Sequence, residues 1–293
     1  MILVIKRLFN LIFTKSKKQH TNNFKKLRNI HRGEDCFIFG DGDSIRNYDL
    51  RNFSRHKSFI TKYLFTHKQF KNLNFKYSTC MDPFFFNSFI NFLLRLFRLP
   101  EYNYKKNLFK NFLFRYLIAK SYKKLISENK NASFFISFYN LLFFNKKRIY
   151  KISEDNNLIL NAFFKFNKNQ FNFYKSSTRL GLSIANYMGF RNIYLIGFDY
   201  LENHVIHTHW YESYSYFGRT SKINDYEKFF FKKIMTNKKS KIIVINKTGK
   251  NNLLPCISYK NFCKKNHISI NKRNMMTSRY KDIFRLTTQY KIW

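Results

Sequence analysis

Residues 176–200 read SSTRLGLSIANYMGFRNIYLIGFDY and hold a helix, its end and a buried strand in one short stretch. Ser176 and Ser177 can cap a helix over about residues 178–188, and Gly189 is a natural stop for it. The run NIYLIGFDY that follows is continuously apolar, as expected of a parallel strand that is buried on both faces. A helix that leads into such a strand predicts an α/β fold.

Segments on either side supply further strands. The runs CFIFG, SFITKYLF and FKYSTCMD precede the central stretch, and KIIVIN follows it after the helix-like DYEKFFFKKIM. The first run leads into the turn GDGDS and then into a polar stretch that we expect to be helical. Strands, Gly-rich turn and helices in this order predict a Rossmann-like, mostly parallel sheet that binds ligands at the carboxyl ends of its strands.

The 293 residues suit one domain of ordinary size that carries an insertion. We expect a single Rossmann-like domain over residues 33–270 and a basic tail over residues 271–293. The insertion covers about residues 84–170, where aromatic and leucine residues recur at helical spacing among basic residues. One or two helices are expected there, either packed on the sheet or forming a lid or a membrane-facing element.

The N-terminal segment, residues 1–32, opens with the apolar and basic run MILVIKRLFNLIF. This run is shorter than the roughly 20 residues that a bilayer crossing needs, and no signal-peptide cleavage site follows it. It fits a short helix lying on the cytoplasmic face of a membrane, or an ordinary packed N-terminal helix. We therefore expect a cytoplasmic protein, with peripheral attachment to the inner face of the cytoplasmic membrane as an alternative.

The chain is strongly basic, with a net charge of +39, yet 44% of its residues are hydrophobic. The apolar fraction excludes a disordered polycation. A/T-rich codons can inflate Lys and Asn, but the scarcity of Asp and Glu, 16 in all, points to an anionic partner such as a phosphorylated substrate, a membrane surface or nucleic acid. The four cysteines show no CxxC spacing and are expected to be free thiols.

The turn after the first strand, residues 40–44, is the first candidate site. Gly40 and Gly42 occur in a chain with only eight glycines, and glycine is needed where a ligand or another backbone comes close. Such a loop before a helix N-terminus is typical of nucleotide or phosphate binding. Asp41 and Asp43 also spell a D-x-D pair that could hold Mg²⁺ or Mn²⁺, although turn chemistry alone explains these residues.

Three segments, FIFGDGDSI, STCMDPFFF and STRLGLSIANYMGFRNIYLIGFDY, resemble the bacterial sialyltransferases of glycosyltransferase family 42 and the wider DUF115-like group of Rossmann-type transferases. The family's loop falls on residues 40–45, its N-P motif on Asp82 and Pro83, and its strand motif on residues 188–200. The resemblance covers roughly residues 35–90 and 172–255. It implies a GT-A-variant fold that binds a CMP-activated acidic sugar, needs no metal ion and transfers the sugar with inversion to a glycan or lipid-linked acceptor.

The resemblance also implies site residues. The nucleotide and the donor sugar are expected to contact Gly40, Asp41, Gly42, Asp43, Ser44, Lys62, Asp82, Ser176, Ser177, Thr178, Arg179, Gly197, Asp199 and Tyr200. Several of these differ from the family pattern, because Asp41 and Asp82 replace asparagines and Asp43 replaces a proline. Lys62 falls near a third family asparagine, and Tyr174 falls near a family arginine that Arg179 or Lys175 could replace.

An inverting transfer needs a general base, and histidine suits this role near neutral pH. The family's histidine position reads Gly218-Arg219-Thr220 here, without a histidine, but the stretch HVIHTHWYES lies upstream. His209 is the preferred base, with His207 and His204 as alternatives in the same stretch. Tyr211 and Glu212 are expected to orient it. His207 and His209 alternate as they would on one face of a strand, but a zinc site lacks a clear third ligand.

The sequence thus predicts a glycosyltransferase that uses a nucleotide-activated sugar in surface glycan synthesis, such as lipopolysaccharide or capsule, and that requires no cofactor. One alternative is a DUF115-like diphosphokinase or another nucleotide-dependent transferase, which would need Mg²⁺ and ATP. The other is a non-enzymatic nucleic-acid-binding protein, favoured by charge and aromatic content but without any recognised motif. Sequence-specific nucleic-acid binding is therefore not expected, and the sequence does not fix an oligomeric state.

Overall fold

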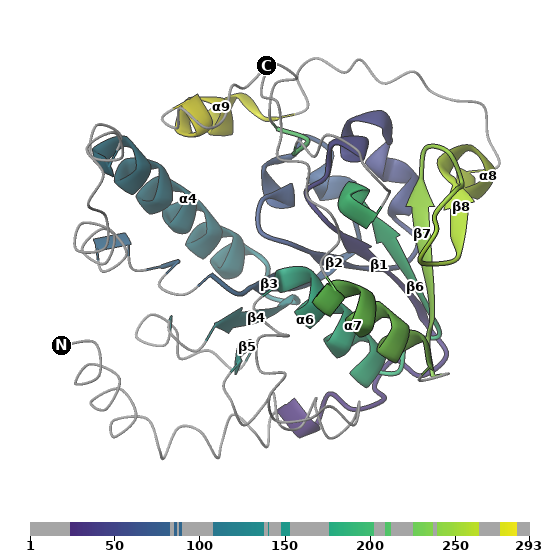
Figure 1. The fold of residues 1–293 in the computed structure, drawn as a ribbon. Helices are drawn as coiled ribbons and strands as arrows, with labels where there is room; N and C mark the ends of the chain where they lie inside the picture. Colours follow the sequence, from purple (N-terminus) through teal and green to yellow (C-terminus); the bar gives the residue numbers. More distant parts are fainter. Residues whose placement is uncertain are drawn as a thin grey trace.

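The computed structural model describes residues 24–82, 85–86, 88–89, 108–137, 140, 148–152, 176–201, 209–211, 225–236, 239–263 and 276–285 (Figure 1). Its strands are β1 (Asp35–Phe39), β2 (Lys57–Ile60), β3 (Phe75–Cys80), β4 (Ser133–Ser137), β5 (Ile149–Ile152), β6 (Asn192–Ile196), β7 (Lys241–Asn246) and β8 (Cys256–Ser258). They form one sheet in the order β5-β4-β3-β2-β1-β6-β7-β8, and every neighbouring pair is parallel. The predicted α/β, Rossmann-like sheet is confirmed.

The strand order reverses once. From β1 the chain moves outward strand by strand to β5, and it then returns to the other side of β1 to add β6, β7 and β8. After β1 and after β6 the chain therefore continues in opposite directions across the sheet, and this opens a crevice between the carboxyl ends of the two strands. In doubly wound sheets this topological switch point is where ligands bind.

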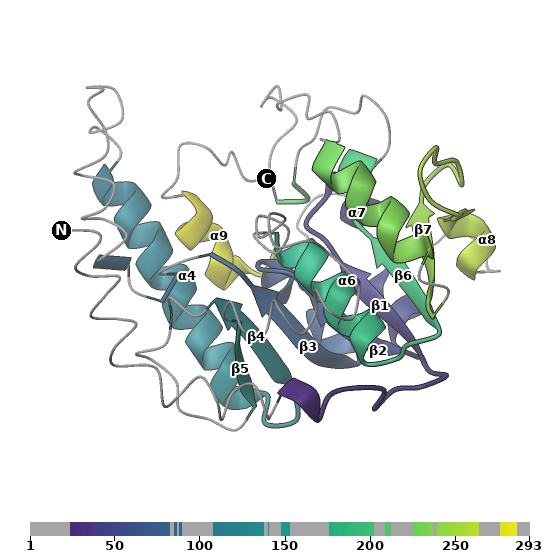
Figure 2. The same ribbon diagram turned by 60° about the horizontal axis from the view of Figure 1, so that its bottom comes forward.

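Helices cover both faces of the sheet (Figure 2). On one face lie α6 (Ser177–Tyr187) and α7 (Asp225–Thr236), and on the other lie α4 (Leu108–Glu128), α8 (Tyr259–Cys263) and α9 (Ser278–Arg285). Strand side chains alternate between the two cores, so that Phe37 and Phe39 join the α4 side while Cys36 and Ile38 join the α6 side. Burial on both faces explains why the strands are continuously apolar.

Two expectations from the sequence need correction. The range 84–170 contains β4 and β5 in addition to the expected helix, so part of the proposed insertion is sheet. The polar stretch after β1 forms two short 3-10 helices, η1 (Asp43–Asn47) and η2 (Leu50–Phe53), in place of the expected longer helix. Both segments are short, and neither shows a sustained period that would separate a strand or a 3-10 turn from a helix.

The beginning of the described chain packs into the body. The ring of Phe24 is buried and stacks on Tyr187 of α6, with ring centroids 5.4 Å apart. The expected membrane-surface helix falls mostly on residues 1–23, which lie outside the described residues, as do residues 286–293 of the expected C-terminal tail.

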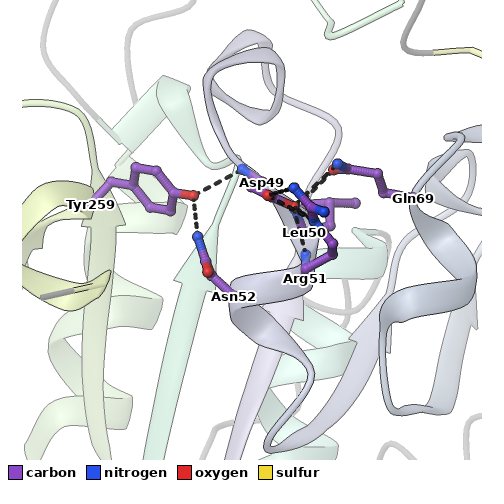
Figure 3. Close-up of polar contacts among 6 residues, drawn as sticks. All are labelled: Asp49, Leu50, Arg51, Asn52, Gln69 and Tyr259. Carbon is purple, nitrogen blue, oxygen red and sulfur yellow. Dashed lines mark hydrogen bonds and ion pairs between the residues drawn. The ribbon is translucent and has the colours of Figure 1, made fainter. Parts of the chain in front are cut away.

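A polar network around the buried Asp49 fixes η2 to the rest of the fold (Figure 3). Asp49 caps η2 by accepting a hydrogen bond from the Arg51 backbone N–H at 3.0 Å, and it also accepts from the side chain of Gln69 at 3.1 Å. The hydroxyl of Tyr259 on α8 accepts hydrogen bonds from the Asp49 backbone at 2.9 Å and from the Asn52 amide at 2.7 Å. The segment around η2 is therefore held between the connection from β2 to β3 and α8.

At the switch point two glycine-bearing loops touch each other. Gly40 donates a hydrogen bond to the Ile196 carbonyl at 2.8 Å, and Gly42 donates one to the Gly197 carbonyl at 2.9 Å. A β-carbon on Gly40 would lie 2.4 Å from the Gly197 carbonyl oxygen. Gly197 itself has a φ of +74°, and a β-carbon there would lie 2.7 Å from a side-chain carbon of Ile45. Only glycine fits at either position.

The Gly40→Ala variant should therefore lower the free energy of unfolding by about 1–3 kcal/mol, because its methyl group meets a backbone oxygen that cannot move aside. Gly181→Ala is the matched control. Its methyl group would meet atoms of Thr79 and Ile38 no closer than 3.7 Å, and alanine favours the helix by up to about 1 kcal/mol. Urea unfolding measures the free energy of unfolding of both variants. Equal losses of stability in the two would contradict the close approach of the loops.

Candidate functional site

A cavity of about 240 Å³ lies at the switch point, at the carboxyl ends of β1, β2 and β6 and beside the N-terminus of α6. It is lined by Gly40, Asp41, Gly42, Thr61, Lys62, Ser177, Thr178, Gly197, Phe198, Asp199 and His209. Segments that are more than 160 residues apart in the sequence thus meet at one edge of the sheet. This is the position that the parallel topology favours for a ligand.

Asp199 holds the Gly-rich loop in place on the β6 side. Its carboxylate accepts a hydrogen bond from the Ser44 backbone N–H at 2.7 Å and a second one from the Ser44 hydroxyl. Burial raises the pKa of Asp199, and the two hydrogen bonds from Ser44 partly oppose this rise. Asp199 therefore caps the start of η1 and forms part of the cavity wall at the same time.

Arg46 fastens a second segment, residues 209–211, to the same loop. Its guanidinium is buried, forms an ion pair with Asp43 at 3.1 Å, and donates hydrogen bonds to the carbonyls of Trp210 at 2.5 Å and His209 at 3.0 Å. The backbone N–H of Trp210 donates a hydrogen bond to the backbone carbonyl of Asp41 at 3.1 Å, and Gly42 forms an antiparallel bridge with His209. One buried cation thus links the Gly-rich loop to the histidine segment.

His209 reaches the cavity from this anchored segment. Its side chain is exposed, and its ring stacks on Tyr211 with centroids 5.1 Å apart and an interplanar angle of 9°. Tyr211 is buried and packs on Tyr63 and Phe284. The imidazole is therefore oriented by a rigid aromatic neighbour while its edge stays accessible to a ligand.

The N-terminus of α6 forms another wall. Ser176 occupies the N-cap position, but its side chain makes no cap hydrogen bond, which corrects the expected capping role. Ser177 joins α6 to β3 in a different way: its hydroxyl accepts from the Met81 N–H at 3.2 Å, and its carbonyl accepts from Thr79 at 3.0 Å. Without a capping side chain, the first-turn N–H groups and the helix dipole favour an anion at this end of the cavity.

Lys62 supplies a positive charge at the carboxyl end of β2. It forms an ion pair with Asp82 after β3, and its ammonium lies 5.0 Å from the ring centroid of Tyr63. Burial alone would lower the pKa of Lys62, but the neighbouring Tyr63 and Asp82 raise it above the ordinary value. Lys62 therefore stays protonated throughout the neutral range, and it lies in the cavity lining with its ammonium paired with Asp82.

The acidic residues of the site are each neutralised or held by another group. Burial raises the pKa of Asp41, and this rise is opposed in part by His209, Lys62 and a hydrogen bond of 3.3 Å from Thr61. Asp43 is paired with Arg46, and Asp199 is bound by Ser44. Pairing with Arg46 therefore offsets the charge of Asp43, and burial shifts Asp41 toward its neutral form.

The two carboxylates of the D-x-D pair are held by different partners. Asp41 is hydrogen-bonded to Thr61, whereas Asp43 is paired with Arg46, so different parts of the fold hold the two carboxylates. Among the described residues no group of three or more His, Cys, Asp and Glu is arranged to hold a metal ion. Asp41 and Asp43 would therefore have to leave their present partners before both could bind one Mg²⁺ or Mn²⁺ ion.

The structure brings most of the predicted site residues together. Lining the cavity are Gly40, Asp41, Gly42, Lys62, Ser177, Thr178, Gly197, Asp199 and His209. Three further predicted residues contact lining residues from behind: Ser44, Asp82 and Tyr211. Asp43 pairs with Arg46, and Ser176 and Arg179 do not line the cavity. His204, His207, Glu212, Tyr174 and Lys175 lie outside the described residues, and so does the side chain of Tyr200.

Three contributors to the site were not predicted. Thr61 and Phe198 line the cavity, and Arg46 anchors residues 209–211. Thr61 directly follows β2, so the rule that ligands bind at the carboxyl ends of strands could have found it. No local signal marks Arg46, because a buried arginine looks the same in a sequence as one on the surface.

Comparison of the chain with family models, curated proteins and solved structures finds no match. Within the described part of the chain, none of the helices combines the length and the apolar run that crossing a bilayer requires.

Replacing Arg46 by Met should lower the free energy of unfolding by about 3 kcal/mol, because Asp43 loses its partner and two carbonyls lose their donor. It should also shift the fluorescence of the buried Trp210 to longer wavelength as residues 209–211 detach. Arg191→Met is the control, since Arg191 is exposed and makes a surface ion pair with Asp35. A loss for Arg46→Met no larger than that of the control would contradict the anchoring role.

A buried histidine, His67, lies beside Trp210 and makes the stability of the fold depend on pH. The ring of His67 lies 5.1 Å from that of Trp210, and its Nδ1 accepts a hydrogen bond from the Gln69 N–H at 3.1 Å. Its Nε2 is buried without a hydrogen-bond partner among the described residues. Burial, with a smaller contribution from Lys68, lowers the pKa of His67 from 6.5 to about 4.

Between pH 4 and pH 6.5 the side chain of His67 is protonated in the unfolded chain but not in the folded protein. Stability should therefore fall by about 3 kcal/mol as the pH drops from 6.5 to 4. His67→Asn keeps an acceptor for the Gln69 N–H and cannot titrate, so the wild type should lose this amount relative to the variant. Urea unfolding across this pH range measures the difference, and parallel pH curves would show that His67 is not the group responsible.

Proposed function

We propose that the protein is a glycosyltransferase that uses a nucleotide-activated sugar. The observation that supports this best is the composition of one cavity at the switch point. A glycine loop, a helix N-terminus, a lysine and a histidine line it together. These are the groups that binding a nucleotide phosphate and removing a proton from an acceptor hydroxyl require.

In this proposal the phosphate of the donor lies at the N-terminus of α6. Ser177 and Thr178 provide hydroxyl and backbone groups there, and Lys62 provides a charge. Gly40 and Gly42 have no side chains, so the nucleoside can approach their backbone closely. The resemblance to family 42 favours a CMP-linked, acidic sugar as donor, and a glycan or lipid-linked hydroxyl as acceptor.

The chemical step needs one proton transfer and no metal ion. The acceptor oxygen forms a bond to the anomeric carbon while the bond from that carbon to the phosphate oxygen breaks with inversion. His209 takes the proton of the acceptor hydroxyl, and the nucleotide leaves with the electron pair of the broken bond. Lys62 and the α6 dipole stabilise the negative charge that develops on the phosphate.

The metal-dependent diphosphokinase is a weaker alternative. It would need the loop carboxylates of Asp41 and Asp43 as Mg²⁺ ligands, but Asp43 is paired with Arg46 and Asp41 is hydrogen-bonded to Thr61. Either carboxylate would have to give up its partner before it could bind a cation. The cavity therefore favours chemistry that does not depend on a divalent ion.

The His209→Asn variant should lower kcat/KM for sugar transfer from a CMP-sugar by at least about 100-fold, because the acceptor proton loses its base. Its affinity for the nucleotide should stay within about threefold, since His209 is assigned to the acceptor and not to the phosphate. Radiolabelled transfer measures the first quantity, and the thermal shift with CMP, UDP and ADP measures the second.

His56→Asn is the matched control, because His56 lies at the amino end of β2, opposite the cavity edge. It should change neither quantity. Absence of turnover or hydrolysis with every CMP-, UDP- and GDP-sugar would overturn the proposed function, and a strict requirement for Mg²⁺ and ATP would favour the diphosphokinase.

A further inference from the structure

Helix α4 presents an exposed row of aromatic side chains. Phe109 is 69% exposed and Tyr116 is 49% exposed. Phe112 is half-buried between them, with ring centroids 6.4 Å from Phe109 and 6.5 Å from Tyr116. The three rings follow one another at the three- and four-residue spacing that places side chains on one helix face. Large aromatic groups exposed in a row call for an apolar partner.

The same helix is strongly basic on its exposed side. Lys110, Lys120 and Lys124 are exposed, and α4 contains a single acidic residue, Glu128, which lies 3.3 Å from Lys124 at the far end. Aromatic rings interleaved with lysines, and almost free of carboxylates, match an anionic interface that has an apolar layer beneath it. An anionic lipid bilayer has this structure, whereas an acidic protein surface lacks the apolar layer and a nucleic-acid duplex keeps its bases stacked inside.

The aromatic row lies on the side of the molecule that holds the cavity. Because α4 connects β3 to the parallel strand β4, it runs against the strands, and its N-terminal end lies at their carboxyl edge. Phe114 confirms this placement, since its ring lies 6.4 Å from that of Tyr63 and 5.2 Å from that of Phe284. Tyr63 in turn adjoins Lys62 in the cavity.

We propose that the exposed face of α4 binds an anionic lipid bilayer peripherally, with Phe109 and Tyr116 entering the interface between head groups and acyl chains and the lysines contacting lipid phosphates. This binding does not depend on the chemistry of the cavity. It would bring the carboxyl edge of the sheet near the membrane surface, where a membrane-linked substrate could reach it. The membrane contact thus involves an element of the folded domain as well as any contribution from residues 1–23.

Co-sedimentation of the full-length protein with vesicles tests the proposal. Binding to vesicles of phosphatidylcholine with 30% phosphatidylglycerol is compared with binding to pure phosphatidylcholine, at about 0.15 M salt. The Phe109→Ser/Tyr116→Ser and Lys110→Glu/Lys120→Glu double variants should each weaken binding to the anionic vesicles at least about tenfold, since each lysine near the surface contributes about fivefold. Pure phosphatidylcholine should bind far less.

Matched controls lie elsewhere on the surface. Phe229→Ser removes an exposed aromatic ring from α7, and Lys232→Glu/Lys241→Glu changes the net charge by the same amount as the α4 lysine variant. Both controls should stay within about twofold of the wild type. Equal losses in the α4 and control variants would show attraction of the whole polycation and overturn the proposal.

A second readout separates insertion from loss of folding. Tryptophan placed at position 109 should be quenched by brominated lipids in anionic vesicles, whereas tryptophan placed at position 229 should not. If Phe109→Ser/Tyr116→Ser lowers the melting temperature by more than the Phe229→Ser control, the row is covered by this protein's own residues and the proposal fails. Preferential binding to RNA over anionic vesicles, lost in the same variants, would also overturn it.

Discussion

The close contact between the loops after β1 and β6 is the constraint on which the site depends. Gly40 and Gly197 let two backbones approach until a β-carbon on either would overlap its neighbour. Strand pairing alone would leave a gap here, because the chain leaves β1 and β6 in opposite directions. The two backbone hydrogen bonds across the contact bring Asp199 to Ser44, and they thereby set the start of η1 and the position of Arg46.

Electrostatic balance follows from this contact. Three aspartates lie around one small cavity, and they would repel an anion if every carboxylate were ionised and unpaired. The fold opposes that repulsion by pairing Asp43 with the buried Arg46, whereas burial raises the pKa of Asp41 and Asp199. Lys62 stays charged because Asp82 and Tyr63 offset the cost of its burial. The lining thus suits a phosphate at one end and hydrogen-bond donors of a ligand at the other.

Local signals predicted the parts of the fold and site that depend on neighbouring residues. β1, β6, the glycine loop and the end of α6 at Gly189 follow from hydrophobic runs and glycine placement, and the switch-point rule brings nine predicted residues to one cavity. β4 and β5 were missed because SFFIS and IYKI are too short to show a period. The anchoring of residues 209–211 by Arg46 could not be predicted, since it depends on a pairing across more than 160 residues that exists only after the sheet closes.

The length of α4 explains why its two ends have different surroundings. Its 21 residues span about 30 Å, whereas the six residues of β3 beside it span about 20 Å, so the helix extends beyond the sheet at the carboxyl edge. Along the sheet its side chains, such as Ile118 and Tyr122, are buried, and toward its N-terminal end the inner side packs on Phe284 of α9. In the part of the chain that the structure describes, no strand covers the outer side of this extension, and Phe109 and Tyr116 are exposed there, on the side of the molecule that holds the cavity.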